Sequence, residues 1–278
     1  MIRVRDLTKY YGSKCAVDSV SLDVERGTVY GLLGPNGAGK TTIIKMLTTL
    51  SRPTRGSIFF DSIDAVRQSE EIRRLIAVVP QDRNFDAELS VYENMLVYGM
   101  LHGVDGLKRK IEESLAALGL SGERNTPAGA LSGGTQKRLL IARTLLPGPE
   151  VLFMDEPSVG LDPQVRRDIW DIVRDIRAGG RTVFLTTHYM EEAESLCDKV
   201  GILSKGRLVI VDTPANLKES VGRYVVETGL PDGKRNRAIC MSRQDAVAIA
   251  EAAGNGAVIR PSNLEDVFIK VTGEVIEQ

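Results

Sequence analysis

The architecture of the chain follows from one segment, Val29-Tyr30-Gly31-Leu32-Leu33-Gly34-Pro35-Asn36-Gly37-Ala38-Gly39-Lys40-Thr41-Thr42. Its first five residues are an apolar run that predicts a buried strand, and residues 40–50 predict a helix. The glycine-rich turn between them, residues 34–41, fits the pattern GxxxxGK[ST] of a phosphate loop. Glycines let backbone N–H groups curl around a polyphosphate, and the helix N-terminus faces the same anion with partial positive charge. The segment predicts a nucleotide-binding site.

Two adjacent carboxylates, Asp155 and Glu156, follow a second apolar run at residues 151–154. In phosphoryl-transfer sites a lysine such as Lys40 reaches the β- and γ-phosphates, and a hydroxyl such as that of Thr41 binds Mg²⁺. Asp155 is suited to the same Mg²⁺ shell, and Glu156 is suited to orienting or deprotonating a water molecule. The phosphate loop alone also fits a small-molecule kinase or a GTPase, but the motifs that follow decide against both.

A second glycine-rich turn, Leu131-Ser132-Gly133-Gly134, precedes another predicted helix. Such a Ser-Gly-Gly turn presents backbone N–H groups and a helix dipole outward, so it is a second anion-binding element. One nucleotide does not need two such elements unless they meet across it, or unless a second copy of the protein brings one.

Composition sets the class of protein. The chain has 278 residues, and its 36 Lys and Arg nearly cancel 37 Asp and Glu. That balance argues against a protein that coats nucleic acid, so we expect no nucleic-acid partner. Three cysteines without a CxxC pair and two histidines argue against a zinc site. The apolar runs are far shorter than the roughly 20 residues of a membrane span, and charges at the N-terminus do not fit a signal peptide. We therefore expect a cytoplasmic α/β protein.

The order of predicted elements divides the chain into two domains. Residues 1–221 hold the phosphate-related motifs on alternating strands and helices. Within them, residues 84–147 look mostly helical and indicate an inserted helical subdomain. Its first helix begins at a capping box of Ser90 and Glu93. Residues 222–278 predict a small α+β domain, with strands near 223–228, 237–241 and 256–260 and helices near 243–252 and 263–271.

The motifs together resemble the nucleotide-binding subunit of an ABC transporter over about residues 1–220. After the phosphate loop come Gln81 in Val78-Val79-Pro80-Gln81, the Ser-Gly-Gly turn, the paired carboxylates, Ser158-Val159-Gly160-Leu161-Asp162 and Thr186-Thr187-His188, all in family order. The resemblance implies a P-loop NTPase (RecA-like) core with an antiparallel β subdomain. It also implies ATP and Mg²⁺ as cofactors.

The resemblance assigns roles to single residues. Tyr11 matches the aromatic residue that stacks on adenine, and Gln81 matches the residue that senses Mg²⁺ and the attacking water. His188 matches the residue that contacts the γ-phosphate, and Asp162 one that bridges two protomers. The family pattern implies a homodimer that holds each ATP between Lys40 of one copy and Ser132, Gly133 and Gly134 of the other. It implies an integral membrane permease as partner, so the chain would lie peripherally on the inner face of the cell membrane. The sequence departs from the pattern at Thr135, where the family most often has Gln.

The C-terminal residues indicate which type of ABC transporter to expect. Residues 263–269 and 271–273 resemble the C-terminal motif of drug- and antibiotic-efflux ATPases of the ABC-2, daunorubicin type. The resemblance implies an ATPase that powers export of a drug-like or other hydrophobic compound by a separate membrane-spanning subunit. Lipid or polysaccharide export, import, and a soluble ABC ATPase without a transport role remain as alternatives.

Overall fold

A computed structural model of the chain describes residues 1–82, 84–229, 235–254 and 256–274. Its centre is a six-stranded sheet in the order β10-β9-β3-β8-β7-β6. All neighbouring strands in it run parallel except β10, which pairs antiparallel with β9. The strands are β3 (Val29–Leu33), β6 (Ile76–Val79), β7 (Val151–Asp155), β8 (Thr182–Thr187), β9 (Lys199–Ser204) and β10 (Arg207–Asp212).

The sheet is covered on both faces. Every residue of β3, β7 and β8 is buried, which explains why residues 29–33, 151–154 and 183–185 do not alternate between apolar and polar side chains. Successive side chains of β7 enter different cores: Val151 and Phe153 join one apolar cluster, and Leu152 and Met154 join the other. Helices α1 (Lys40–Leu47) and α2 (Ser69–Leu75) contribute to the first cluster, and α6 (Pro163–Ala178), α7 (Met190–Leu196) and α8 (Pro214–Val221) to the second.

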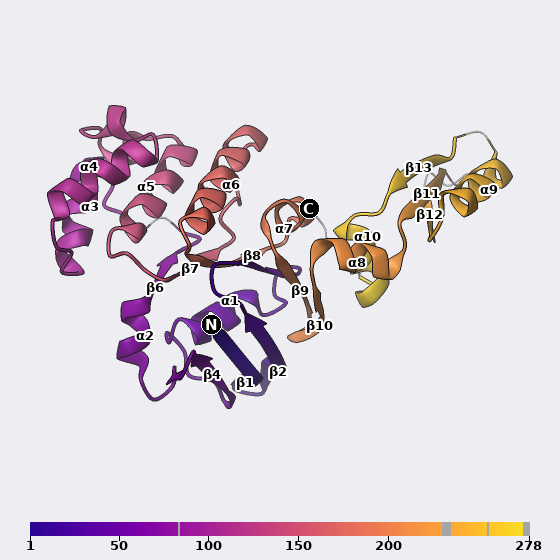
Figure 1. The fold of residues 1–278 in the computed structure, drawn as a ribbon, viewed down its shortest axis with the longest axis horizontal. Helices are drawn as coiled ribbons and strands as arrows, with labels where there is room; N and C mark the ends of the chain where they lie inside the picture. Colours follow the sequence, from indigo (N-terminus) through magenta and orange to yellow (C-terminus); the bar gives the residue numbers. More distant parts are fainter. Residues whose placement is uncertain (83, 230–234, 255, 275–278) are drawn as a thin grey trace.

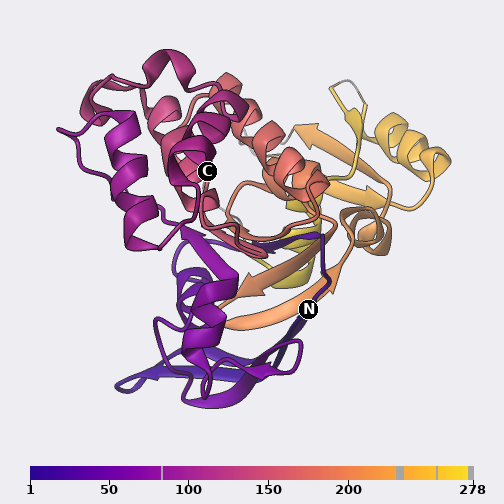
Figure 2. The same ribbon diagram turned by 60° about the vertical axis from the view of Figure 1, so that its left-hand side comes forward.

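A four-stranded antiparallel sheet, in the order β2-β1-β4-β5, packs on the first cluster. Its strands are β1 (Ile2–Tyr11), β2 (Lys14–Val24), β4 (Arg55–Phe60) and β5 (Ile63–Asp64). Figure 2 shows the helical subdomain at the top of the molecule and this antiparallel sheet at the bottom. The helical subdomain consists of α3 (Val91–Leu101), α4 (Leu107–Ala117), α5 (Gly133–Leu145) and two short 3₁₀ turns, with an apolar core of its own. The predicted capping box at Ser90 and Glu93 is present.

The C-terminal residues form a small unit that extends away from the rest of the molecule (Figure 1). Strands β11 (Tyr224–Gly229), β12 (Arg235–Cys240) and β13 (Val258–Pro261) make an antiparallel sheet in the order β12-β11-β13, against which α9 (Arg243–Ala253) packs. Helix α10 (Leu264–Thr272) instead returns to α7 and α8. Its Leu264, Val267 and Phe268 are fully buried in the second apolar cluster.

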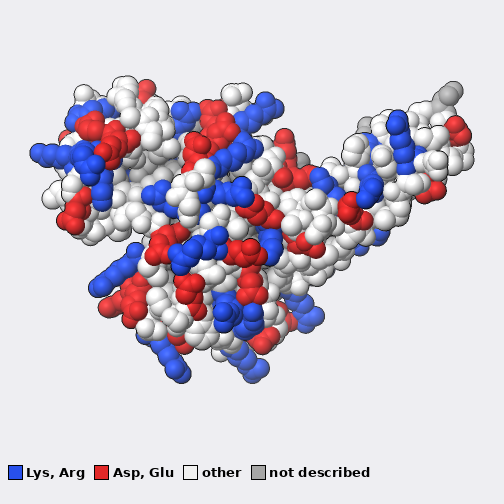
Figure 3. Space-filling model, viewed as in Figure 1, with Lys and Arg blue, Asp and Glu red and all other residues white. Residues whose placement is uncertain are grey.

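Two local expectations differ from the structure. The helix expected over residues 40–50 ends at Leu47, because the Thr48 hydroxyl donates to the carbonyl of Ile44 and Thr49 takes a left-handed φ of 62°. The pattern of residues 2–7 predicts a first strand over those residues alone, but the strand runs to Tyr11, since β1 pairs with β2 along its whole length. Elsewhere, Figure 3 shows acidic and basic side chains intermingled over the face in view, in keeping with the near-zero net charge.

Candidate nucleotide-binding site

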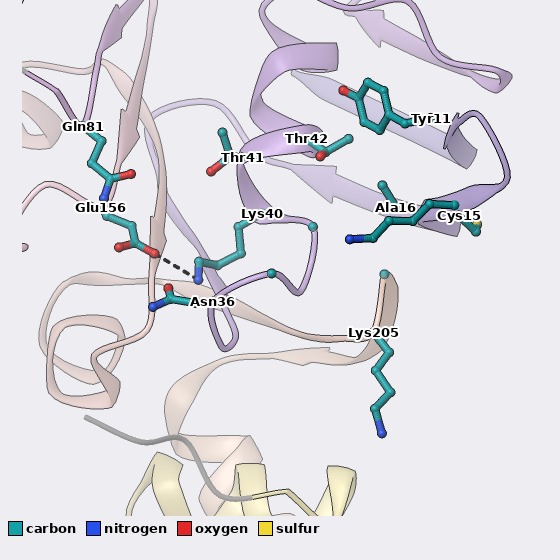
Figure 4. Close-up of a pocket in the computed structure, with 14 residues that line it drawn as sticks. Tyr11, Cys15, Ala16, Asn36, Lys40, Thr41, Thr42, Gln81, Glu156 and Lys205 are labelled. Atoms are coloured by element: carbon teal, nitrogen blue, oxygen red, sulfur yellow. Dashed lines mark ion pairs between the residues drawn. The ribbon is translucent and has the colours of Figure 1, made fainter.

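A cavity of about 480 Å³ opens at the carboxyl end of β3. Figure 4 shows side chains from several separate segments around it. Carboxyl ends of neighbouring parallel strands meet at one edge of a sheet, which is where α/β proteins bind ligands. The residues that line the cavity are Tyr11, Lys14, Cys15, Ala16, Asn36, Gly37, Gly39, Lys40, Thr41, Thr42, Gln81, Glu156, Lys205 and Gly206.

The phosphate loop has a backbone that requires glycine. Gly37 and Gly39 have φ angles of 79° and 109°, in the region that disfavours other residues. A Cβ atom at Gly39 would lie 2.6 Å from the carbonyl oxygen of Ala16, and one at Gly34 would lie 2.3 Å from that of Leu203. The loop therefore fits closely between β2 and β9, and its shape suits a polyphosphate.

Lys40 is the buried cation of the loop. Its side chain is 4% exposed, and Nζ donates to the carbonyl oxygens of Gly34 at 2.7 Å and Pro35 at 3.1 Å. The same Nζ lies 3.0 Å from Oε1 of Glu156 (Figure 4). A charge this buried costs free energy unless it is paired, so the Glu156 carboxylate and the loop carbonyls hold it in place.

Glu156 follows β7 in a left-handed conformation, with a φ of 47°. Its N–H donates to the carbonyl of Thr186 on the adjacent strand β8 at 3.1 Å. Oε2 of Glu156 lies 3.2 Å from Nδ1 of His188, so its two oxygens face Lys40 and His188. A non-glycine residue at positive φ stores about 1–3 kcal/mol of strain, and such residues cluster at functional sites.

Oxygen ligands for Mg²⁺ lie near the same place. Thr41 and Gln81 line the cavity, and Asp155 is buried directly before Glu156, where it accepts a 2.5 Å hydrogen bond from the hydroxyl of Thr186. Mg²⁺ prefers one or two carboxylate or hydroxyl oxygens completed by water and phosphate oxygens, and this set fits that preference. Among the described residues, no group of three His, Cys, Asp or Glu side chains could hold a metal ion by itself.

Tyr11 stands at the end of β1, where its ring is 49% exposed and opens on the cavity. Lys9 Nζ lies 5.1 Å from the ring centroid. The ring is thus available to a flat ligand group beside the phosphate loop.

The Ser-Gly-Gly turn and Asp162 lie elsewhere. Within the part of the chain that the structure describes, neither is among the residues that line the 480 Å³ cavity. Ser132 begins α5, and its hydroxyl accepts from the N–H of Thr135 at 3.2 Å, while Asp162 caps α6 through the N–H of Val165 at 3.0 Å. Gly133 lines a separate cavity of about 200 Å³, which it shares with Gln81.

Sequence reasoning missed the turn between β9 and β10. The pattern of residues 199–211 predicts a hairpin that turns at Lys205 and Gly206, but nothing in the sequence placed that turn at the nucleotide cavity. The N–H of Gly206 donates to the carbonyl of Ala38 in the phosphate loop at 2.9 Å, so the turn holds the loop backbone in place. The side chain of Lys205 points away, toward the C-terminal helices, and pairs with Glu274 at 2.5 Å. Hydrogen bonds from Lys205 and Ser204 lower the pKa of that carboxyl.

Known proteins resemble the chain throughout. Residues 17–159 match the sequence family described as ABC transporter. A Nod factor export ATP-binding protein I from Cupriavidus pinatubonensis is 37% identical, over 98% of this chain and 91% of its own length.

Two solved structures carry the same fold. An ATP-binding subunit of an ABC transporter is 28% identical with a TM-score of 0.71, over 79% of this chain and 92% of that one. A dimeric ATP-binding cassette in a post-hydrolysis state, bound to ADP and Pi, is 26% identical with a TM-score of 0.68, over 77% and 98%. The predicted α/β P-loop NTPase fold is confirmed. No helix of the described residues is long and apolar enough to cross a bilayer. The chain belongs to the ABC transporter family, as one of its ATP-binding subunits, and is an ATPase coupled to transport.

Proposed function

We propose that two copies of this chain hydrolyse ATP between them to power export by a separate membrane-spanning subunit. The observation that carries the proposal is the convergence of Lys40, Glu156 and His188 at the phosphate loop, while the Ser-Gly-Gly turn lies outside that cavity. Charge and geometry thus supply one half of a reaction centre in each copy.

The chemistry follows from these positions. The phosphate loop and Lys40 hold the β- and γ-phosphates, and Tyr11 stacks on adenine. Glu156 orients a water molecule and accepts its proton, and His188 steadies the γ-phosphate as it leaves. Asp155, Thr41 and Gln81 are the residues that would hold Mg²⁺, which neutralises phosphate charge when it is bound. The Lys40–Glu156 contact pairs two largely buried charges at the phosphate loop.

A second copy completes the site. Ser132 and Gly133 are exposed at the start of α5, where free backbone N–H groups suit an anion. In a head-to-tail pair, these groups would meet the γ-phosphate held by Lys40 of the other copy, and Asp162 would bridge the two chains. The dimer found for a solved cassette of similar fold supports this arrangement.

The membrane partner is proposed from the surface and from the relatives. Leu50, Val97, Met100 and Leu101 are large, exposed apolar side chains, and Leu50 lines a cavity of about 570 Å³ between the end of α1, β6 and the end of α3. Val97, Met100 and Leu101 do not line this cavity, but they lie on α3, whose Tyr98 borders it. Exposed apolar side chains beside a cavity mark an interaction site, and we assign this one to the membrane subunit. The chain would then lie peripherally on the inner face of the membrane.

Export is favoured by the relatives' printed name, Nod factor export ATP-binding protein I. The match covers 98% of this chain, so it includes most of residues 222–278. A drug-like or other hydrophobic substrate, as in the ABC-2 type, is the finer part of the proposal. It rests on the tail motif at residues 263–273.

The test is Glu156→Gln, with the exposed Glu70→Gln as matched control. We expect the Glu156 variant to keep ATP binding, to accumulate as an ATP-bound dimer, and to hydrolyse about 10²–10⁴-fold more slowly. Rapid-quench hydrolysis and size-exclusion chromatography with ATP measure both effects. Turnover at the control's rate would remove Glu156 from the reaction. Copurification with a membrane protein of several apolar spans, rather than with ribosomes or DNA, tests the transport role.

A further inference from the structure

A buried polar cluster next to the candidate site has no part in the chemistry above. Ser158, Trp170 and Glu192 are all buried, and the side chains of Ser158 and Glu192 are 0% exposed. We refer to these three residues as the Glu192 cluster. None of them lines the 480 Å³ cavity, so none is placed to touch the nucleotide.

The hydrogen bonds of the cluster converge on one carboxylate oxygen. The hydroxyl of Ser158 donates a short hydrogen bond to Oε1 of Glu192, and the indole N–H of Trp170 donates to the same oxygen at 3.1 Å. The indole also lies 3.2 Å from the Ser158 hydroxyl oxygen. Burial raises the pKa of Glu192, and the hydrogen bonds from Ser158 and Trp170 act against that rise. A buried carboxyl with this many donors costs free energy if any one of them is removed.

Each member of the cluster belongs to a segment that carries a candidate site residue. Ser158 is two residues after Glu156. Glu192 lies in the first turn of α7, four residues after His188. Trp170 lies two turns into α6, the helix that Asp162 caps. The cluster therefore ties the loop that follows β7 and helix α6 to the start of α7.

A second contact supports the same joint. Arg166 is one helical turn before Trp170 on the same face of α6, and its guanidinium lies 4.2 Å from the ring centroid of Tyr189. The ring of Tyr189 in turn lies 4.2 Å from that of His188. Helix α6 thus contacts the start of α7 at two levels, and one of them reaches His188 through the ring of Tyr189.

We propose that the Glu192 cluster is a positioning device, which sets the placement of Glu156 and His188 relative to Asp162, and so to the second copy. The inference rests on the proposed roles of those three residues. Displacing a catalytic group by about 1 Å can cost about 10²-fold in rate, so loss of one cluster hydrogen bond lowers turnover without weakening ATP binding. If the cluster were merely structural, loss of one of its hydrogen bonds would lower the stability of the protein and leave the turnover rate of the folded enzyme unchanged.

The matched pair Ser158→Thr and Ser158→Val tests this. The two new side chains have nearly the same shape, but only threonine keeps the hydroxyl that donates to Glu192. With the full-length chain, we expect kcat for ATP to be about tenfold lower in Ser158→Val than in Ser158→Thr, with the dissociation constant for ATP within about twofold. Thr144→Val, which removes a buried hydroxyl within α5, is the control for loss of a buried hydrogen bond alone.

Equal kcat values for the two Ser158 variants, or a difference matched by Thr144→Val, would overturn the proposal. If Ser158→Val does not fold, Trp170→Phe removes the indole donor together with part of the ring, and the same drop in kcat with unchanged ATP affinity is expected. Unchanged kcat in Trp170→Phe would count against the cluster. Where Glu156→Gln is inactive but these variants turn over normally, the positioning inference fails and the proposed function stands.

Discussion

The phosphate loop and the Ser-Gly-Gly turn are alike in sequence and unlike in surroundings. Both are glycine-rich turns that open a helix, α1 or α5. The loop lines a 480 Å³ cavity with a buried lysine, and its Gly34 and Gly39 lie close against neighbouring backbone. Ser132 and Gly133 are exposed, and a Cβ at Gly133 would meet nothing within 4 Å. On the proposed function, the anion-binding element is complete at the phosphate loop, whereas the Ser-Gly-Gly turn would receive its ligand from a second copy.

Lys40→Ala gives the largest expected effect, because it removes the cation that makes the loop complete. We expect ATP affinity to fall by at least about 100-fold and hydrolysis to be lost. Isothermal titration with Mg²⁺-ATP measures the affinity. Lys45→Ala, on the exposed side of the same helix, is the control and should bind ATP normally. Normal ATP affinity in Lys40→Ala would show that the two turns do not differ in the way described.

Ser132→Arg tests the incomplete turn. A bulky side chain there keeps the turn away from the γ-phosphate held by the other copy, so we expect turnover to fall about 10²-fold while a single copy still binds ATP. Mixing this variant with Lys40→Ala should restore roughly a quarter of wild-type activity, since mixed dimers keep one intact site.

No recovery on mixing, together with a wild-type rate that stays first-order in protein on dilution, would mean that one copy is sufficient. The comparison between the two turns would then lose its functional meaning.

The smallest expected effect is on the free energy of unfolding, which an alanine substitution should lower in the phosphate loop but not in the Ser-Gly-Gly turn. Gly39→Ala places a methyl group 2.6 Å from the carbonyl of Ala16 at a φ of 109°, and should lower the free energy of unfolding by about 1–3 kcal/mol. Gly133→Ala should change it by less than about 0.5 kcal/mol. Thermal unfolding of both variants without nucleotide measures the difference. A comparable loss at Gly133 would indicate that its turn is already packed within the single chain.

The phosphate loop could be predicted from sequence because its backbone allows few residue types, and the spacing of glycines, lysine and threonine records that restriction. The grouping of Lys40, Glu156 and His188 in one site was implied by the family resemblance, and the structure brings them together because each follows a buried parallel strand of one sheet. The roles assigned to these residues, and the boundary at residue 221, stay predictions.

The sequence could not show what depends on strand order or on burial. The β9–β10 turn supports the phosphate loop only because β9 lies beside β3, and a hairpin pattern does not name its neighbours. Glu192 reads as a surface residue of an acidic helix, since nothing in its local pattern indicates that Ser158 and Trp170 surround it. The helix from Lys40 ends early because of a side-chain hydrogen bond that propensity does not weigh.

Helix α10 has a practical consequence for how the molecule can be divided. Its Leu264, Val267 and Phe268 fill the core under α7 and α8, and burying each contributes about 1.5–3 kcal/mol. A chain cut after residue 222 would leave α7 with an uncovered apolar face, directly behind His188 and Glu192. Any loss of hydrolysis in such a shortened protein would then reflect damage to the ATP-binding domain itself. A deletion meant to remove only the β12-β11-β13 sheet should therefore keep α10 and join it to α8.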